Sequence, residues 1–138
     1  MKNKFKNLEH KSDVLFIAYG RNAKETIQNA AQAMLDTISK TEKIKPNKKI
    51  TIRVKSENLE NLIIDTLNLV LAKSDAKEIF FKKIKIEKLD VKKAALTATC
   101  IGSAQTPILG KTVVKAATFH EFELNKGKKW KVKILLDI

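Results

Sequence analysis

The segment that sets the fold is LEHKSDVLFIAYG, Leu8–Gly20. Six of the eight residues from Asp13 onward are apolar, and the run closes on a glycine. Such a run predicts a buried strand over Asp13–Tyr19. His10 and Asp13 stand at its entrance, and a second aspartate, Asp137, lies one residue from the end of the chain in LLDI. The first core strand and the last residues therefore both carry polar groups that need an explanation.

The composition is that of one ordinary domain. The chain has 138 residues, of which 43% are hydrophobic and 31% charged, enough apolar side chains to fill a core. We therefore predict a single domain over residues 1–138. The lone cysteine, Cys100, excludes an intramolecular disulfide, and its alternating apolar context LTATCIG predicts a small buried side chain.

Neither a targeting segment nor a membrane span is evident in the sequence. The start, MKNKFKNLEHK, is basic but lacks the apolar run of a signal peptide. The longest apolar stretch, LIIDTLNLVLA, is interrupted by polar residues and is too short to cross a bilayer. We therefore expect a cytoplasmic protein without a membrane partner, and the single cysteine fits a reducing compartment.

The net charge of +13 has two interpretations. An excess of this size is typical of proteins with an anionic partner, such as nucleic acid, an acidic protein or a membrane surface. However, only Arg21 and Arg53 are arginines, the residue that nucleic-acid binders prefer, and the lysines are spread along the whole chain. A solvated, lysine-biased surface therefore explains the charge as well as a binding patch does.

The first half of the chain alternates strands and helices. Asn22 followed by Glu25 has the form of a capping box and predicts a helix over Ala23–Ser39. KITIRVKS predicts a half-buried strand, after which Ser56 is expected to cap a helix over Glu57–Lys73 that KSDAK ends.

The second half of the sequence predicts strands. They are expected within IFFKKIKIEKL, AALTATCIG, TVVKAATFHEFELN and KWKVKILLDI, with a hairpin turn at Asn125-Lys-Gly127. The resulting order, β-α-β-α-β-β-β-β, predicts an α+β domain with two helices packed on a largely antiparallel sheet.

Signatures of common enzyme sites are absent from the sequence. The four glycines are isolated, so they form no phosphate-binding loop, and no serine or cysteine lies in a nucleophile-elbow context. Two histidines and one cysteine are too few and too scattered for a structural zinc site.

The acidic groups at the two ends of the predicted sheet remain. If the first and last strands pair antiparallel, Asp13, Asp137 and the α-carboxylate of Ile138 converge, and a divalent cation would offset their repulsion. The alternatives are a turn aspartate and a solvated terminal aspartate. His120, in a strand with alternating burial, is expected to be a partly buried structural histidine, and His10 an exposed or hydrogen-bonded one, although either can serve as base or ligand.

Five segments together resemble the archease family. The resemblance covers nearly the whole chain, and the segments follow the family's order and spacing. They are LEHKSDVLFIAYG at the start, NAAQAMLDTIS and LIIDTLNLVL in the two predicted helices, VVKAATFHEFEL, and the terminal LLDI.

The resemblance implies a function and a site. Archeases are accessory proteins of the GTP-dependent RtcB-type RNA ligase that joins tRNA exons, so the chain would not be an enzyme itself. It would promote guanylylation and multiple turnover of the ligase and meet RNA only indirectly. Asp13 matches the family's first acidic metal ligand, and Asp137 and Ile138 match its acidic and C-terminal ligands. The implied ion is Ca²⁺, with Mg²⁺ or Mn²⁺ as alternatives, and His10, Lys115 and His120 would support the same tip or face the ligase.

The chain departs from the family pattern at three places. Lys11 replaces the usual threonine, Phe119 replaces the usual tyrosine, and Leu69-Val70 stand where acidic residues are common. Two other functions remain open: a basic RNA-binding module or RNA chaperone, which the +13 charge favours, and a small hydrolase that uses His10 and Asp13.

Overall fold

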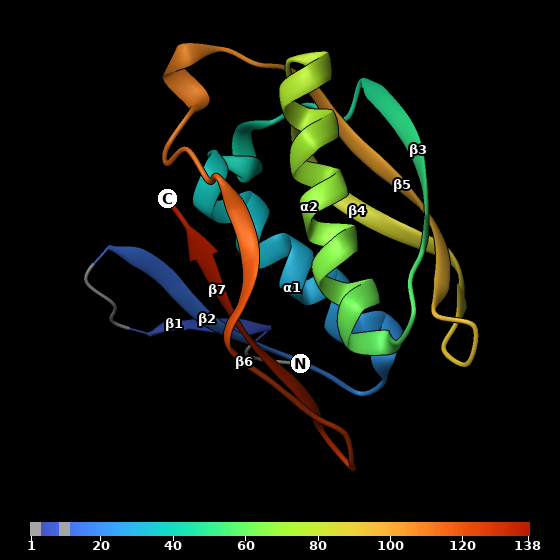
Figure 1. The fold of residues 1–138 in the computed structure, drawn as a ribbon. Coiled ribbons are helices and arrows are strands. Elements are labelled where there is room, and N and C mark those ends of the chain that lie inside the picture. The colour runs from blue at the N-terminus through green and yellow to red at the C-terminus, as the bar shows by residue number, and fades with distance from the viewer. Residues whose placement is uncertain (1–3, 9–11) are drawn as a thin grey trace.

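A computed structural model describes residues 4–8 and 12–138, and Figure 1 labels its helices and strands. The strands and helices are β1 (Phe5–Leu8), β2 (Asp13–Gly20), α1 (Ala23–Ile38), β3 (Lys48–Lys55), α2 (Leu59–Lys77), β4 (Ile79–Asp90), β5 (Ala95–Ala104), β6 (Ala116–Asn125) and β7 (Trp130–Asp137). Two short 3₁₀ turns cover Thr41–Lys43 and Pro107–Leu109.

The strands form two antiparallel sheets. One has four strands in the order β1-β2-β7-β6, and the other has three in the order β3-β5-β4. The predicted α+β class is confirmed. The division into two sheets was not predicted, because alternation along a segment shows that it is a strand but not which strand it joins.

Both sheets and both helices contribute to one core. Phe16 of β2 and Ile134 of β7 belong to the same buried cluster as Ile86 of β4, with Ile27 of α1 and Leu62 of α2 between them. Figure 1 shows the two helices lying between the sheets. The described chain contains no helix long and apolar enough to cross a membrane.

Helix α1 begins where the capping box predicts. The side chain of Asn22 accepts a hydrogen bond of 2.9 Å from the backbone N–H of Glu25. The Glu25 carboxylate in turn accepts bonds from the backbone N–H of Arg21 at 3.0 Å and from its guanidinium at 2.7 Å. The helix ends at Ile38, with Ser39 as its C-cap.

Helix α2 differs from its prediction at both ends. Asn58, not Ser56, caps it by accepting a bond of 2.8 Å from the Asn61 N–H. The Ser56 hydroxyl instead donates to the Asp65 carboxylate at 2.7 Å. KSDAK does not end the helix, which continues to Lys77 because the polar residues of this segment are compatible with a helix. The hydroxyl of the buried Ser74 also donates a hydrogen bond to the backbone carbonyl of Ile79, beyond the end of the helix.

One predicted strand is shorter than expected, and one further strand was not predicted. The long predicted strand 112–125 begins only at Ala116, and its register breaks between Thr118 and Glu123. Strand β1 was not predicted, because a strand of four residues is too short to show a pattern of alternating apolar and polar residues. Cys100 is fully buried as predicted, and this burial raises the pKa of its thiol to about 12.

Candidate metal centre at two strand ends

The two ends of the sequence meet in the four-stranded sheet. Strands β2 and β7 run antiparallel, and their register pairs Asp13 with Asp137 and Val14 with Leu136. Residues directly opposite each other on neighbouring antiparallel strands point to the same face, with Cβ atoms about 4.5–5.5 Å apart. Both carboxylates therefore project from the same face at the same end of the sheet.

The carboxylate pair stands at the rim of an apolar surface. Asp13 is half-buried and Asp137 is exposed. Because side chains alternate along a strand, the next pair on the same face is Leu15 and Leu135, which are 6% and 4% exposed. Ile138, which carries the α-carboxylate, is 36% exposed. Apolar neighbours on one side strengthen electrostatic interactions of the carboxylates relative to those in open water.

A backbone hydrogen bond ties the end of β7 to the segment that precedes β6. The N–H of Lys115 donates to the backbone carbonyl of Asp137 at 2.7 Å, and Ala116 pairs with Asp137 in the sheet. Strand β7 is thus held on both sides up to its last paired residue. The side chain of Asp137 takes part in no ion pair with the described residues.

His120, one of the two predicted histidines, does not join the pair. His120 lies four residues along β6 from the residue that pairs with Asp137, in the stretch where the register breaks. Its side chain is 71% exposed, and its Nε2 lies 3.9 Å from the Glu121 carboxylate. The predicted partial burial of His120 is therefore wrong, because the regular alternation of β6 is interrupted at this position. His10 and Lys11 lie outside the described residues.

The donors at the strand ends suit a hard cation. Two carboxylates and an α-carboxylate supply only oxygen atoms, which Ca²⁺ and Mg²⁺ prefer and which differ from the sulfur and nitrogen ligands typical of structural zinc. Like charges directly opposite each other destabilise a strand pair. Among residues 4–8 and 12–138, no three His, Cys, Asp or Glu side chains form a metal-binding group. Within the described residues, a third protein ligand for a site here would be the α-carboxylate of Ile138, beside Asp13 and Asp137.

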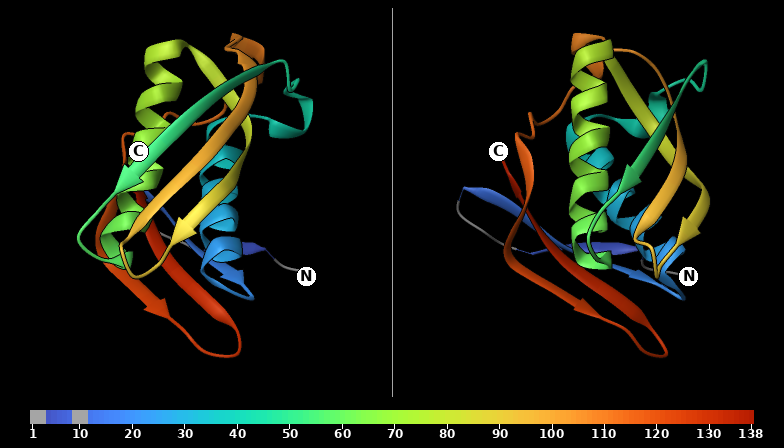
Figure 2. Two further views of the ribbon diagram at one scale, coloured as in Figure 1. Left: turned by 90° about the vertical axis from the view of Figure 1, so that its right-hand side faces the viewer. Right: turned by 45° about the vertical axis from the view of Figure 1, so that its right-hand side comes forward.

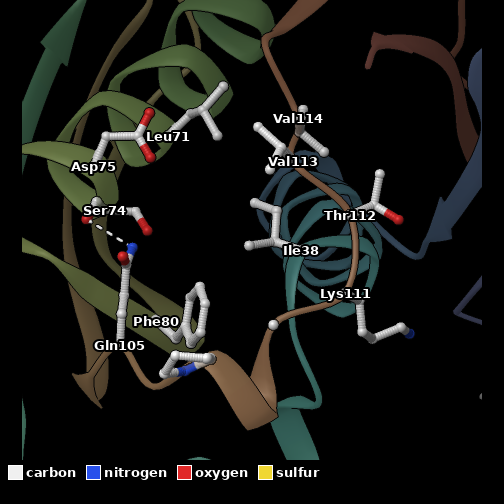
Figure 3. Close-up of a pocket in the computed structure, with 12 residues that line it drawn as sticks. Ile38, Leu71, Ser74, Asp75, Phe80, Gln105, Lys111, Thr112, Val113 and Val114 are labelled. Atoms are coloured by element: carbon white, nitrogen blue, oxygen red, sulfur yellow. Dashed lines mark hydrogen bonds between the residues drawn. The ribbon is translucent and has the colours of Figure 1, made fainter.

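A partly apolar hollow lies elsewhere in the fold. A cavity of about 370 Å³ lies between the end of α2 and the extended segment before β6. Figure 3 shows Leu71 on one wall and Val113 on the other. Gln105 crosses its floor and donates to the backbone carbonyl of Ser74 at 3.2 Å. Asp75 is the one carboxylate among its lining residues. Lys111, its other charged lining residue, comes from the opposite wall, so the cavity does not gather charged side chains at one point.

The fold and the strand-end geometry define a class: a small α+β protein whose first core strand and last strand pair at their carboxylate-bearing ends. The model of the Archease protein family (MTH1598/TM1083) matches residues 5–138. The chain belongs to the archease family.

Relatives agree with this assignment over nearly the whole chain. The chain is 32% identical to protein archease of Sulfurisphaera tokodaii, with 98% of this chain and 99% of that protein aligned. It is 30% identical to protein archease of Methanosarcina mazei, with 98% and 96% aligned.

The solved structures extend the likeness to the fold. The solution structure of Methanobacterium thermoautotrophicum protein 1598 superposes with a TM-score of 0.81 at 28% identity, covering 98% of this chain and 99% of that one. A Thermotoga maritima crystal structure, described as an archease and "possible chaperone", has a TM-score of 0.68 at 21% identity and covers 96% of each chain.

Proposed function

We propose that this protein is a non-catalytic activator of a GTP-dependent RtcB-type RNA ligase in tRNA splicing and RNA repair. It promotes ligase guanylylation and repeated turnover through a tip that holds a divalent cation, with Ca²⁺ as the first choice. The observation that carries the proposal is the register of Asp13 opposite Asp137 beside the C-terminus. Membership of the archease family supports the choice of partner.

Each group of the tip has a defined part in this proposal. The carboxylates of Asp13 and Asp137 and the α-carboxylate of Ile138 supply oxygen ligands from two neighbouring strands. A bound cation would neutralise these groups and hold the two strand ends in one arrangement. The hydrogen bond from Lys115 to the carbonyl of Asp137 restrains the last paired residue of the chain. A tip restrained in this way can enter a ligase cleft at a small entropic cost.

The test is RNA ligation with RNA in large excess over the ligase of the same organism. The wild-type protein is expected to convert joining that stops near one product per ligase into repeated turnover. Asp13→Asn, Asp137→Asn and deletion of Ile138 are each expected to reduce that gain at least tenfold, which corresponds to about 1.4 kcal/mol.

The control is Asp75→Asn, which removes the same charge from an exposed residue of α2 outside the strand ends. It is expected to activate as well as wild type. Equal activation by Asp137→Asn and wild type would refute the cation-binding tip and leave the ligase as partner. If wild type gives no activation at all, the ligase is not the partner.

A further inference from the structure

The three-stranded sheet has one face turned away from the helices. The left panel of Figure 2 looks onto this face, where β3, β5 and β4 lie in front and the helices lie behind them. Ile52, Ala98, Cys100, Ile84 and Ile86 point inward and are buried. The residues that alternate with them therefore form the outward surface of the sheet.

Both outer strands of this sheet carry basic residues on the outward surface. Because the register pairs them with outward positions of β5, their placement does not depend on one strand alone. All six are exposed, and none forms an ion pair with a described residue. We call them the basic face: Lys49, Arg53 and Lys55 on β3 and Lys83, Lys85 and Lys88 on β4.

The cations lie in two lines across a central strand. Lys49 and Lys83 flank Ile101, and Arg53 and Lys88 flank Thr97. Neighbouring strands are about 4.8 Å apart, so the lines are about 10 Å apart, and alternate residues along a strand repeat about every 6.8 Å. The basic face thus gathers six cations in two lines on one surface, although Thr51 separates Lys49 from Arg53 on β3 and the register shifts before Lys88 on β4.

The floor between the two lines is narrow and carries hydroxyl groups. Thr97 and Thr99 are half-buried there, and Thr51 pairs with Thr99 from β3. Ile101 is only 9% exposed between its two lysine neighbours. The ring of Phe80, near one end of the sheet, lines the cavity of Figure 3 instead. The floor offers hydrogen-bonding groups and no ring on which a base would stack.

Two acidic residues on β4 reduce the positive charge of the basic face without neutralising it. Glu87 accepts a hydrogen bond from the Thr99 hydroxyl at 3.3 Å, and Asp90 accepts one from the Lys93 N–H at 3.0 Å. Six basic side chains against these two leave a strong positive excess on one surface. An extended polyanion is the partner that such a surface attracts.

We propose that the basic face binds the phosphodiester backbone of RNA without regard to base sequence. A phosphodiester chain carries a negative charge at every nucleotide, so it can contact cations at several places along both lines. Threonine hydroxyls can exchange hydrogen bonds with the ribose 2′-hydroxyl, which DNA lacks. The choice of RNA over DNA rests in part on the proposed function, because an RNA ligase brings RNA to this protein.

The test is fluorescence anisotropy of a labelled single-stranded oligouridylate with the whole protein and no ligase. The face variant is Lys49→Gln/Arg53→Gln/Lys85→Gln. The control variant is Lys126→Gln/Lys128→Gln/Lys131→Gln, which removes the same charge from exposed residues of the β6–β7 hairpin. We expect the face variant to weaken RNA binding at least tenfold and the control less than twofold.

Salt dependence adds a second measure of the same surface. In a plot of log affinity against log salt concentration, each phosphate that the protein neutralises on a single strand makes the negative slope steeper by about 0.7. The face variant, which removes three cations, should therefore make that slope shallower by about 2. Glu87→Gln should tighten RNA binding, because it removes a negative charge from the face.

Three results would overturn the proposal. Equal losses in the face and control variants would mean that total charge alone attracts RNA. Equally tight binding of polyglutamate would assign the face to an acidic protein, and equally tight binding of the matching DNA oligomer would contradict the choice of RNA. Asp137→Asn should bind RNA like wild type, so failure of the strand-end tip and failure of the basic face are separate outcomes.

Discussion

The two sheets carry their distinctive groups in different places. In the four-stranded sheet, the acidic groups stand at the ends of β2 and β7, and sequence positions 13 and 137 become neighbours only through strand pairing. In the three-stranded sheet, the cations stand on the outward surface, on residues that alternate with the core. A strand end can therefore gather a few ligands at a point, whereas a sheet surface can present a repeated charge.

The two arrangements differ in what they require of the fold. The carboxylate pair depends on the topology of the whole chain, because a different partner for β7 would separate it from Asp13. The basic face depends mostly on alternation within two strands. Both sheets nevertheless share one buried cluster, so damage to either core should affect both surfaces.

Gly102→Ala should have the largest effect, because its added Cβ collides directly with a neighbouring strand of the three-stranded sheet. A Cβ at Gly102 would lie 2.0 Å from the carbonyl oxygen of Phe80 and 2.7 Å from the Cα of Phe81, so the β4–β5 pairing must shift. We expect a loss of about 4 kcal/mol in the free energy of unfolding by urea denaturation. Gly110→Ala is the control, since its Cβ would approach the Phe80 ring only to 3.4 Å. Equal losses in both variants would contradict the close approach of β4 and β5 at Gly102.

Truncation of one core residue in each sheet asks whether the sheets unfold together. Ile134 of β7 and Ile86 of β4 are both fully buried in the common cluster. Ile134→Ala and Ile86→Ala should each lower the free energy of unfolding by about 3 kcal/mol, from reduced burial and a residual cavity. Calorimetry should show a single transition in each variant. Two separate transitions in either variant would mean that the sheets are independent units.

The two helix caps should contribute similar amounts to the free energy of unfolding, and each should contribute less than a buried core side chain. Asn22 and Asn58 each accept one backbone N–H at the start of their helix. Asn22→Ala and Asn58→Ala are each expected to cost about 1 kcal/mol of unfolding free energy. Ser56→Ala, which replaces the residue that the sequence suggested as the second cap, should cost clearly less than Asn58→Ala. The reverse order would restore Ser56 as the cap.

The smallest effect concerns an ion pair on the outer surface of the four-stranded sheet. Lys133 lies 2.5 Å from the Glu123 carboxylate, and its hydrogen bond and charge lower the pKa of that carboxyl. A lowered folded-state pKa stabilises the protein above the unfolded pKa, and this contribution is lost as the pH falls through the folded value. Lys133→Gln should return the pKa of Glu123 toward its ordinary 4.5 in an NMR titration. An unchanged pKa would show that the pair is broken in solution.

Much of the fold was predictable because local patterns determine it. The apolar run after Asp13 predicts β2, and the capping box at Asn22 predicts the start of α1. The same kind of pattern favoured Ser56 over Asn58, because both residues can cap a helix and only the folded chain shows which one does. The division into two sheets and the register break in β6 depend on strand partners and could not be inferred from alternation.

The candidate site was predictable only in part. The sequence raised the meeting of Asp13 and Asp137 as a condition, and the observed register meets that condition. Cation binding by these residues and Ile138 stays a prediction. The backbone bond from Lys115 needed the structure, because no side-chain pattern marks a main-chain donor. The basic face likewise needed the register, since scattered lysines in sequence do not show which of them share a surface.

The most direct test of the carboxylate tip is calorimetric titration of Ca²⁺ into the wild-type protein, Asp137→Asn and Asp75→Asn. We predict one Ca²⁺ per chain for wild type and for Asp75→Asn, and at least a tenfold weaker affinity for Asp137→Asn. Binding of equal strength in all three proteins, or no binding of Ca²⁺, Mg²⁺ or Mn²⁺ to the wild type, would contradict a cation site at the paired strand ends.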